Sequence, residues 1–130
     1  MSAVDQLQSL RDRVIPMLVH VKAEYADRTP ENYPVIVDNV RRGVVGIELD
    51  PNFALYFSHD GTAVFADVYY REHRIDARTS AGREKYSGRP KDDVRPLSAT
   101  VSDVELRNLL AEMLSRFNMQ PQMIHITDTD

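Results

Sequence analysis

Apolar and polar residues alternate most clearly between positions 43 and 71. In three consecutive segments of this stretch every second residue is apolar, which is the period of a strand with one buried face. Turn-forming residues separate these segments, first Asp50-Pro51-Asn52 and then Asp60-Gly61. We therefore predict three antiparallel strands, namely the segment around Val45, Ile47 and Leu49, then Phe53–Ser58, then Thr62–Arg71 with a continuation through Ile75. Their common buried face comprises Val45, Ile47, Leu49, Phe53, Leu55, Phe57, Val64, Ala66, Val68 and Tyr70.

The residues of the other parity predict a second face with aromatic character. Tyr56, Phe65 and Tyr69 alternate with the buried set, so they point away from it. Asp67 lies between Phe65 and Tyr69 on the same parity, and we expect it in a half-buried, concave surface as a candidate binding residue. Glu48 shares this parity as well, but a single acidic residue on a strand usually belongs to the strand's polar face.

The N-terminal segment has the periodicity of an amphipathic helix. From Ser2 to about Asp27 the apolar residues recur at spacings of three and four. Pro16 removes one backbone hydrogen bond and crowds the preceding turn, so we predict a kink between Asp12 and Pro16, or two short helices. The apolar stripe predicts packing on the sheet, with a dimer seam as the alternative; it comprises Leu7, Leu10, Val14, Met17 and Val21.

A second helix is predicted from Ser102 to Asn118. Ser102 and Glu105 match the capping box that begins helices, and Pro121 prevents continuation beyond Asn118. Three strands with one apolar face are not stable alone in water, so we expect both helices to cover that face. The apolar side of this second helix comprises Leu106, Leu109, Leu110, Met113, Leu114 and Phe117.

The remaining segments complete an α+β domain. Arg28–Pro34 reads as a connector, and Val35–Gly43 fits a strand better than a short helix because it is rich in β-branched residues. The apolar pattern disappears from Ala77 to Pro96, which predicts a long, mobile, basic loop. Alternation returns in Gln122–Thr127 and predicts a last strand. The predicted fold is one α+β domain over residues 1–130, an antiparallel meander of four to five strands in the order α-β-β-β-β-α-β.

Composition changes this picture mainly through the distribution of charge. A chain of 130 residues fits one domain with a substantial core. The absence of cysteine excludes disulfides, and the N-terminus lacks the basic start and apolar run of a signal peptide, so we expect a soluble, cytoplasmic protein. The net charge is −4, but the segment from Arg71 to Arg95 holds eight basic and five acidic residues, a charge of +3, which leaves −7 for the rest.

Candidate chemistry is sparse. The four histidines lack the spacing of a zinc site, and no phosphate-loop, nucleotide or nucleophile motif is present, so we expect no metal, cofactor or catalytic constellation. The one acid/base candidate is His73, and a small-ligand enzyme with a pocket between sheet and helices would use His73 or Asp67. The basic segment repeats a small-Gly-Arg pattern around a tyrosine, features that bind phosphate or nucleic acid; its candidate residues are Arg83, Lys85, Tyr86 and Arg89.

No motif assigns the chain to a family. Its order of elements resembles that of small α+β modules such as the secretion-chaperone-like folds, which implies helices on one face of a curved sheet and dimerisation, and transfers no residue. Our leading hypothesis is a non-enzymatic interaction module, homodimeric, that presents Tyr56, Phe65 and Tyr69 to a partner or to itself. The alternatives are nucleic-acid or phosphate binding by residues 74–95 and a small-ligand enzyme that uses His73 or Asp67.

Overall fold

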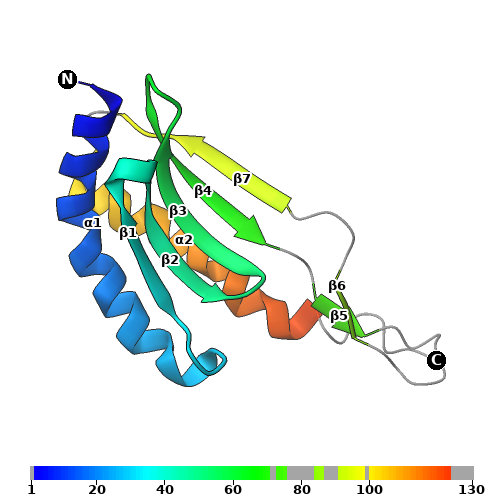
Figure 1. Cartoon of the computed structure of the whole chain (residues 1–130). Coiled ribbons are helices and arrows are strands. Elements are labelled where there is room, and N and C mark those ends of the chain that lie inside the picture. The colour runs from blue at the N-terminus through cyan, green and yellow to red at the C-terminus, as the bar shows by residue number, and fades with distance from the viewer. Residues whose placement is uncertain (1, 71–72, 76–83, 87–90, 99, 124–130) are drawn as a thin grey trace.

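The chain forms a five-stranded antiparallel sheet with two helices on one of its faces (Figure 1). The computed structural model describes residues 2–70, 73–75, 84–86, 91–98 and 100–123. The strand order is β1-β2-β3-β4-β7, and the short strands β5 and β6 pair separately. The elements are α1 (Ala3–Tyr25), β1 (Val35–Asn39), β2 (Val44–Asp50), β3 (Phe53–His59), β4 (Val64–Tyr70), β5 (His73–Ile75), β6 (Glu84–Tyr86), β7 (Lys91–Pro96) and α2 (Asp103–Met123), with 3-10 turns at Ala26–Arg28 and Val40–Arg42.

The three central strands follow the predicted alternation, and the α+β class is confirmed. Val45 lies opposite Phe57, and Leu55 lies opposite Val68, all on the face that the helices cover. Each of these side chains is at most 1% exposed, and burial of one such side chain stabilises the fold by about 1.5–3 kcal/mol. Leu7, Val14 and Leu106 bring the helices into the same core. The preference for a strand at the start of Val35–Gly43 is also confirmed.

Pro16 lies inside α1 without dividing it. The helix begins where the Ser2 hydroxyl accepts a hydrogen bond from the Asp5 amide (3.1 Å), and it continues unbroken to Tyr25. A proline in a helix interior costs about 3 kcal/mol. Buried residues on both sides of the proline, including Val14 and Leu18, outweigh that cost. The alternative of two short helices is therefore wrong, and Figure 1 shows a single helix whose axis curves along the sheet.

The second helix begins where it was predicted but runs further. The Ser102 hydroxyl accepts from the Glu105 amide (3.1 Å), which confirms the N-terminal cap. Asn118 does not end the helix, because its side-chain oxygen accepts from the Tyr25 hydroxyl (3.0 Å) and so ties α2 to the end of α1. α2 continues through Pro121 to Met123. The predicted strand Gln122–Thr127 is thus wrong at its first two residues, and residues 124–127 lie outside the described residues.

The fifth strand of the sheet comes before α2, within the segment 77–96 that the apolar pattern predicted to be a loop. That prediction is wrong where β6 and β7 lie, and residues 76–83 and 87–90 are outside the described residues. The continuation of the third strand through Ile75 is also wrong, since β4 ends at Tyr70 and β5 pairs with β6 instead. β7 escapes detection because it is an edge strand whose helix-facing residues are charged rather than apolar.

Those charged residues of β7 bind α2. Arg95 contacts Glu112 at 2.6 Å, and Arg116 contacts Asp93 at 2.5 Å. Arg95 also reaches Asp93 at 3.2 Å, so four side chains form one network between strand and helix. The hydrogen bonds to Glu112 and Asp93 raise the pKa of Arg95. This network attaches β7 to α2. In the central strands, buried apolar side chains attach the sheet to the helices instead.

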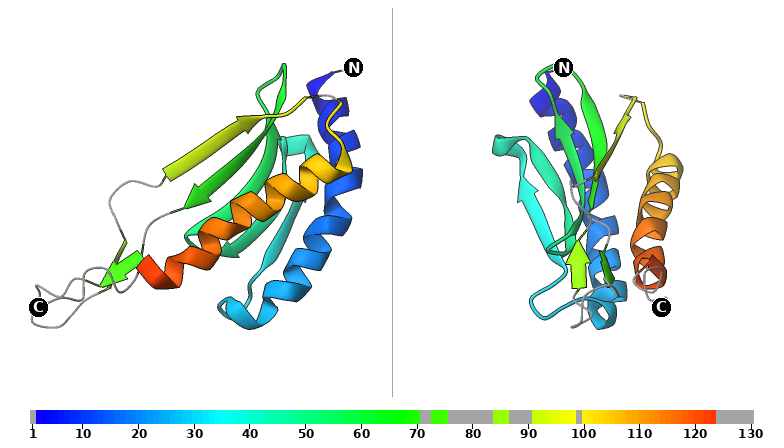
Figure 2. Two further views of the ribbon diagram at one scale, coloured as in Figure 1. Left: turned by 180° about the vertical axis from the view of Figure 1, so that it is seen from behind. Right: turned by 90° about the vertical axis from the view of Figure 1, so that its right-hand side faces the viewer.

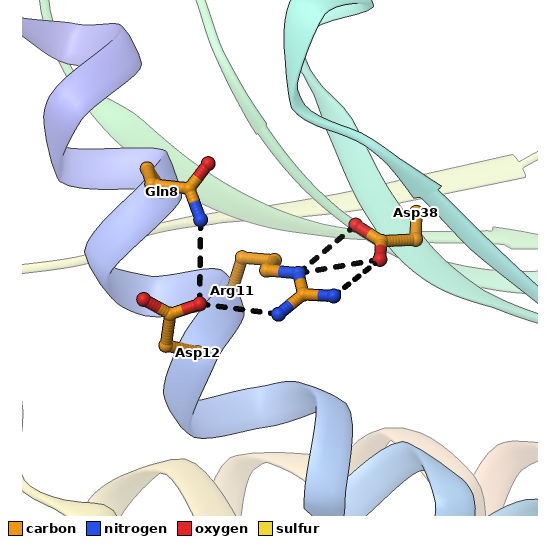
Figure 3. Close-up of polar contacts among 4 residues, drawn as sticks. All are labelled: Gln8, Arg11, Asp12 and Asp38. Carbon is orange, nitrogen blue, oxygen red and sulfur yellow. Dashed lines mark hydrogen bonds and ion pairs between the residues drawn. The ribbon is translucent and has the colours of Figure 1, made fainter.

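The opposite edge strand, β1, is attached in the same way to α1 (Figure 3). The guanidinium of Arg11 holds the carboxylate of Asp38 through Nη2 at 2.6 Å and Nε at 3.1 Å, and it also contacts Asp12 at 3.1 Å. Gln8 completes the group through Asp12 at 3.3 Å. The hydrogen bond from Arg11 lowers the pKa of Asp38. Inward-pointing charges on an edge strand also discourage pairing with other strands, so both edges of this sheet are protected.

Candidate binding surface on the open face of the sheet

The face of the sheet opposite the helices, called the open face below, is the candidate site. Figure 1 looks onto it, and the left view of Figure 2 shows both helices in front of the other face. Of the described elements, none covers the open face. The strand registers place on it Val35, Val37, Asn39, Val44, Gly46, Glu48, Ala54, Tyr56, Ser58, Phe65, Asp67, Tyr69, Asp92, Val94 and Pro96.

Tyr56 occupies the centre of the open face and is held in place. It lies opposite Gly46 on β2 and opposite Asp67 on β4. Its hydroxyl donates a hydrogen bond of 2.6 Å to Oε2 of Glu48. A methyl group on Gly46 would lie 2.9 Å from Cδ1 of Tyr56 and 2.0 Å from the carbonyl oxygen of Leu55. Glycine at this position therefore makes room for both the ring and the neighbouring strand.

A β-bulge brings Glu48 onto this face. Asp50 pairs with Phe53 across the turn, but Glu48 pairs with Ala54, so the register shifts between these two positions. Without the shift, Glu48 would lie opposite the buried Leu55. The bulge therefore separates the carboxylate from the core and sets it within reach of Tyr56.

The surroundings of Tyr56 change the pKa of its hydroxyl group. Burial, the hydrogen bond to Glu48 and the nearby acidic groups, Asp67 and Tyr69 among them, raise the pKa of the Tyr56 hydroxyl. The hydroxyl therefore stays protonated at neutral pH and remains a hydrogen-bond donor to Glu48. Glu48 at the hydroxyl group and Asp67 on the neighbouring strand β4 both contribute to this raised pKa.

Phe65 and Tyr69 flank Asp67 along β4. Their neighbours on β3 are small, with Ser58 opposite Phe65 and Ala54 opposite Tyr69, and both rings are half-buried. On the other side, Val94 of β7 lies opposite Asp67 and is 55% exposed. The carboxylate of Asp67 thus sits among aromatic and aliphatic groups that a partner can contact.

The structure brings together four of the residues that the sequence singled out, Tyr56, Phe65, Asp67 and Tyr69. His73 and Tyr86 are paired on the separate strands β5 and β6, with Lys85 beside them, so the backbone places them outside the five-stranded sheet. Arg83 and Arg89 lie outside the described residues, and the basic segment stays a prediction. Sequence reasoning missed Gly46 and the role of Glu48. A glycine inside a strand was the available signal, because it often marks a close approach of another group.

Asp67 faces away from the helices, so it does not line a pocket between the sheet and the helices. Two surface pockets lined by described residues lie elsewhere. A groove of about 370 Å³ between α1 and α2 is lined mainly by apolar residues such as Met17, Val21 and Leu114. A smaller pocket of about 90 Å³ lies beside Arg13. Within the described part of the chain, no three His, Cys, Asp or Glu side chains are grouped to hold a metal ion.

Comparison with known proteins gives no further guidance to function. The chain matches no protein-family model, no characterised protein and no solved structure. As for membranes, the described residues include no helix with the length and apolarity needed to cross a bilayer.

Proposed function

We propose that this protein is a non-enzymatic binding module whose open face holds a segment of a partner protein. The observation that carries this proposal is a half-buried aromatic cluster on a sheet face that no described element covers, with Tyr56 at its centre. Aromatic residues, tyrosine above all, combine a large contact area with a polar group and are enriched where proteins bind one another.

The cluster is also preorganised for binding. Tyr56 is fixed by Glu48 at one end and by the space over Gly46 along its ring, so it loses little conformational freedom when a partner binds. Ordering a side chain at an interface costs about 0.5–1.5 kcal/mol, and a side chain that is already ordered avoids most of that cost. Because both edge strands are protected by charges, we expect recognition through side chains of the open face rather than by addition of a strand.

Self-association through the same face is the second form of this proposal. Two facing copies would bring Glu48 and Asp67 of one copy toward the same carboxylates of the other, and like charges at an interface are unfavourable. A different partner therefore fits the open face better than a second copy does.

Selection from an unbiased displayed library of nine-residue peptides tests the proposal. We expect peptides enriched on the wild-type protein to bind at least tenfold more weakly to the variant with Tyr56→Ser and Tyr69→Ser. The matched control replaces two exposed apolar residues on the helices, Val19→Ser and Val104→Ser, and should bind as the wild type does. Light scattering of the same proteins reports their oligomeric state. Equal binding by both double variants, or failure to enrich any peptide, would refute the proposal.

A further inference from the structure

Building on the proposed function, we infer that the open face recognises an extended segment that carries arginine, with the guanidinium over the Tyr56 ring between Glu48 and Asp67. The proposed function concerns where a partner binds. This inference concerns the chemistry of the partner.

The charge of the open face points to a cationic partner. By register, its described residues include three acidic residues, Glu48, Asp67 and Asp92, and no Lys, Arg or His. The arginines that hold the edge strands, Arg11, Arg95 and Arg116, bind acidic residues on the helix side of the sheet. A phosphate or a nucleic-acid backbone would meet like charge on the open face, whereas a basic group would meet opposite charge.

The positions of two of these three acidic residues suit one cation. Glu48 and Asp67 belong to β2 and β4, which lie on either side of β3, and Tyr56 of β3 stands between them. Strands are about 4.8 Å apart, so the two outer backbones are separated by roughly 10 Å. The Glu48 side chain turns toward Tyr56, as their hydrogen bond of 2.6 Å shows. That bond uses Oε2, and within the described residues Oε1 of Glu48 accepts no hydrogen bond.

Arginine fits this arrangement better than lysine does. Its guanidinium is planar, so it stacks on an aromatic ring while its edges donate several hydrogen bonds in fixed directions. Tyr56 offers the ring, and the negative charges of Glu48 and Asp67 lie on the strands to either side of it. An ammonium group is a point charge that gains the attraction but not the stacking. Phe65, Tyr69 and Val94 then provide apolar contacts for the residues next to the arginine.

The size of the face favours an extended segment over a folded partner. Five strands about 4.8 Å apart and roughly 20 Å long give a footprint of roughly 500 Å². A stable interface between folded proteins buries about 800 Å² on each side. About six extended residues span roughly 20 Å, which matches the length of the strands. The second copy is disfavoured by the same comparison and by the repulsion of its carboxylates.

Peptides that differ at one position test the inference. The peptides selected on the wild-type protein are synthesised with arginine, lysine, citrulline or glutamate at the central position, and their binding is measured by fluorescence anisotropy. Citrulline has the shape of arginine without its charge. We expect arginine peptides to bind at least tenfold more tightly than citrulline peptides, lysine peptides to fall between them, and glutamate peptides not to bind. Added salt should weaken the arginine peptides most.

Two single variants, Glu48→Gln and Asp67→Asn, should each reduce the preference for arginine over citrulline, and together they should abolish it. The matched control removes two exposed charges elsewhere, with Asp27→Asn and Glu31→Gln, and should keep the preference. An arginine preference that survives the loss of both carboxylates overturns the inference. Citrulline peptides that bind as tightly as arginine peptides, yet lose affinity in the tyrosine double variant, overturn the inference and leave the proposed function standing. If no peptide is selected at all, both fail.

Discussion

Replacing Gly46 with alanine tests how the central strands and the open face fit together. The added methyl group would lie 2.0 Å from the carbonyl oxygen of Leu55 and 2.9 Å from both Cα and Cδ1 of Tyr56. Unbonded carbon atoms are at their optimal separation at about 3.5–4.0 Å, so β2 and β3 must move apart locally by roughly 1 Å. The backbone of β3 is fixed by pairing on both of its sides, and this strand cannot yield as the end of a flexible side chain would.

The magnitude follows from opposing effects. Glycine inside a strand is worse than alanine by about 0.5–1 kcal/mol, so without a clash the substitution would stabilise the protein. Inserting a group into a packed region costs about 1–3 kcal/mol, and losing a ladder hydrogen bond adds about 1 kcal/mol. Displacement of Tyr56 also weakens its bond to Glu48. We expect a net loss of about 2–3 kcal/mol, which is a large part of the roughly 5–15 kcal/mol that stabilises a domain.

Urea denaturation followed by circular dichroism measures this loss. A destabilisation of about 2–3 kcal/mol should lower the urea midpoint by roughly 1–2 M. Ser58→Ala, a small change on the same face, is the control and should stay within about 0.5 kcal/mol of the wild type. In a Tyr56→Ala background, Gly46→Ala should cost less, because the ring clash is gone while the carbonyl clash remains. A Gly46→Ala protein as stable as the wild type, or more stable, would contradict a close approach of β3 to Gly46.

Three further predictions concern the core, the edge and the site. Phe53 packs against Phe117 at 5.2 Å between ring centroids, so Phe53→Ala should cost about 3–5 kcal/mol in urea denaturation, whereas Val104→Ala, at an exposed position, should change little. Asp93→Asn should cost about 1 kcal/mol or less, since its ion pairs are partly exposed, but it should speed hydrogen exchange in β7 more than in β2; equal effects in both strands would contradict the role of the network. Burial and the hydrogen bond to Glu48 raise the pKa of Tyr56 in the folded protein above its value in the unfolded chain. This difference in pKa contributes to the free energy of unfolding below about pH 10, and the contribution is lost as the pH rises toward the pKa of Tyr56 in the folded protein. In an alkaline absorbance titration, Tyr56→Phe should remove the last part of the tyrosinate signal and Glu48→Gln should move it to lower pH; unchanged curves would refute this.

The central sheet could be predicted because the burial of apolar side chains determines which residues form its strands. Burial of every second residue in β2, β3 and β4 is worth several kcal/mol per pair of facing residues, and it leaves a clear period in the sequence. β7 leaves no such trace, because Asp93 and Arg95 find their partners on α2, where Glu112 and Arg116 lie some twenty residues further along the chain. The end of α2 was missed for a similar reason. Asn118 suits a helix end by its own conformational preference, but its contact with Tyr25 engages the side chain in a tertiary bond instead.

On the open face, the sequence also constrains the register of β2 and β3, beyond the alternation of apolar and polar residues. A turn that pairs Asp50 with Phe53 would, continued without interruption, place Glu48 opposite Leu55 and Ile47 opposite Tyr56. Facing residues lie on the same side of a sheet, so this register would set a carboxylate against the core and a buried isoleucine against an exposed tyrosine. The burial pattern of β2 and β3 therefore requires a shift of one residue, and the bulge between Glu48 and Asp50 supplies it. That shift puts Glu48 two residues along from the position facing Tyr56, where Gly46 leaves room for the ring to reach it. The hydrogen bond between Tyr56 and Glu48 therefore depends on the bulge, which allows the tight turn and the alternating buried residues to occur in the same pair of strands.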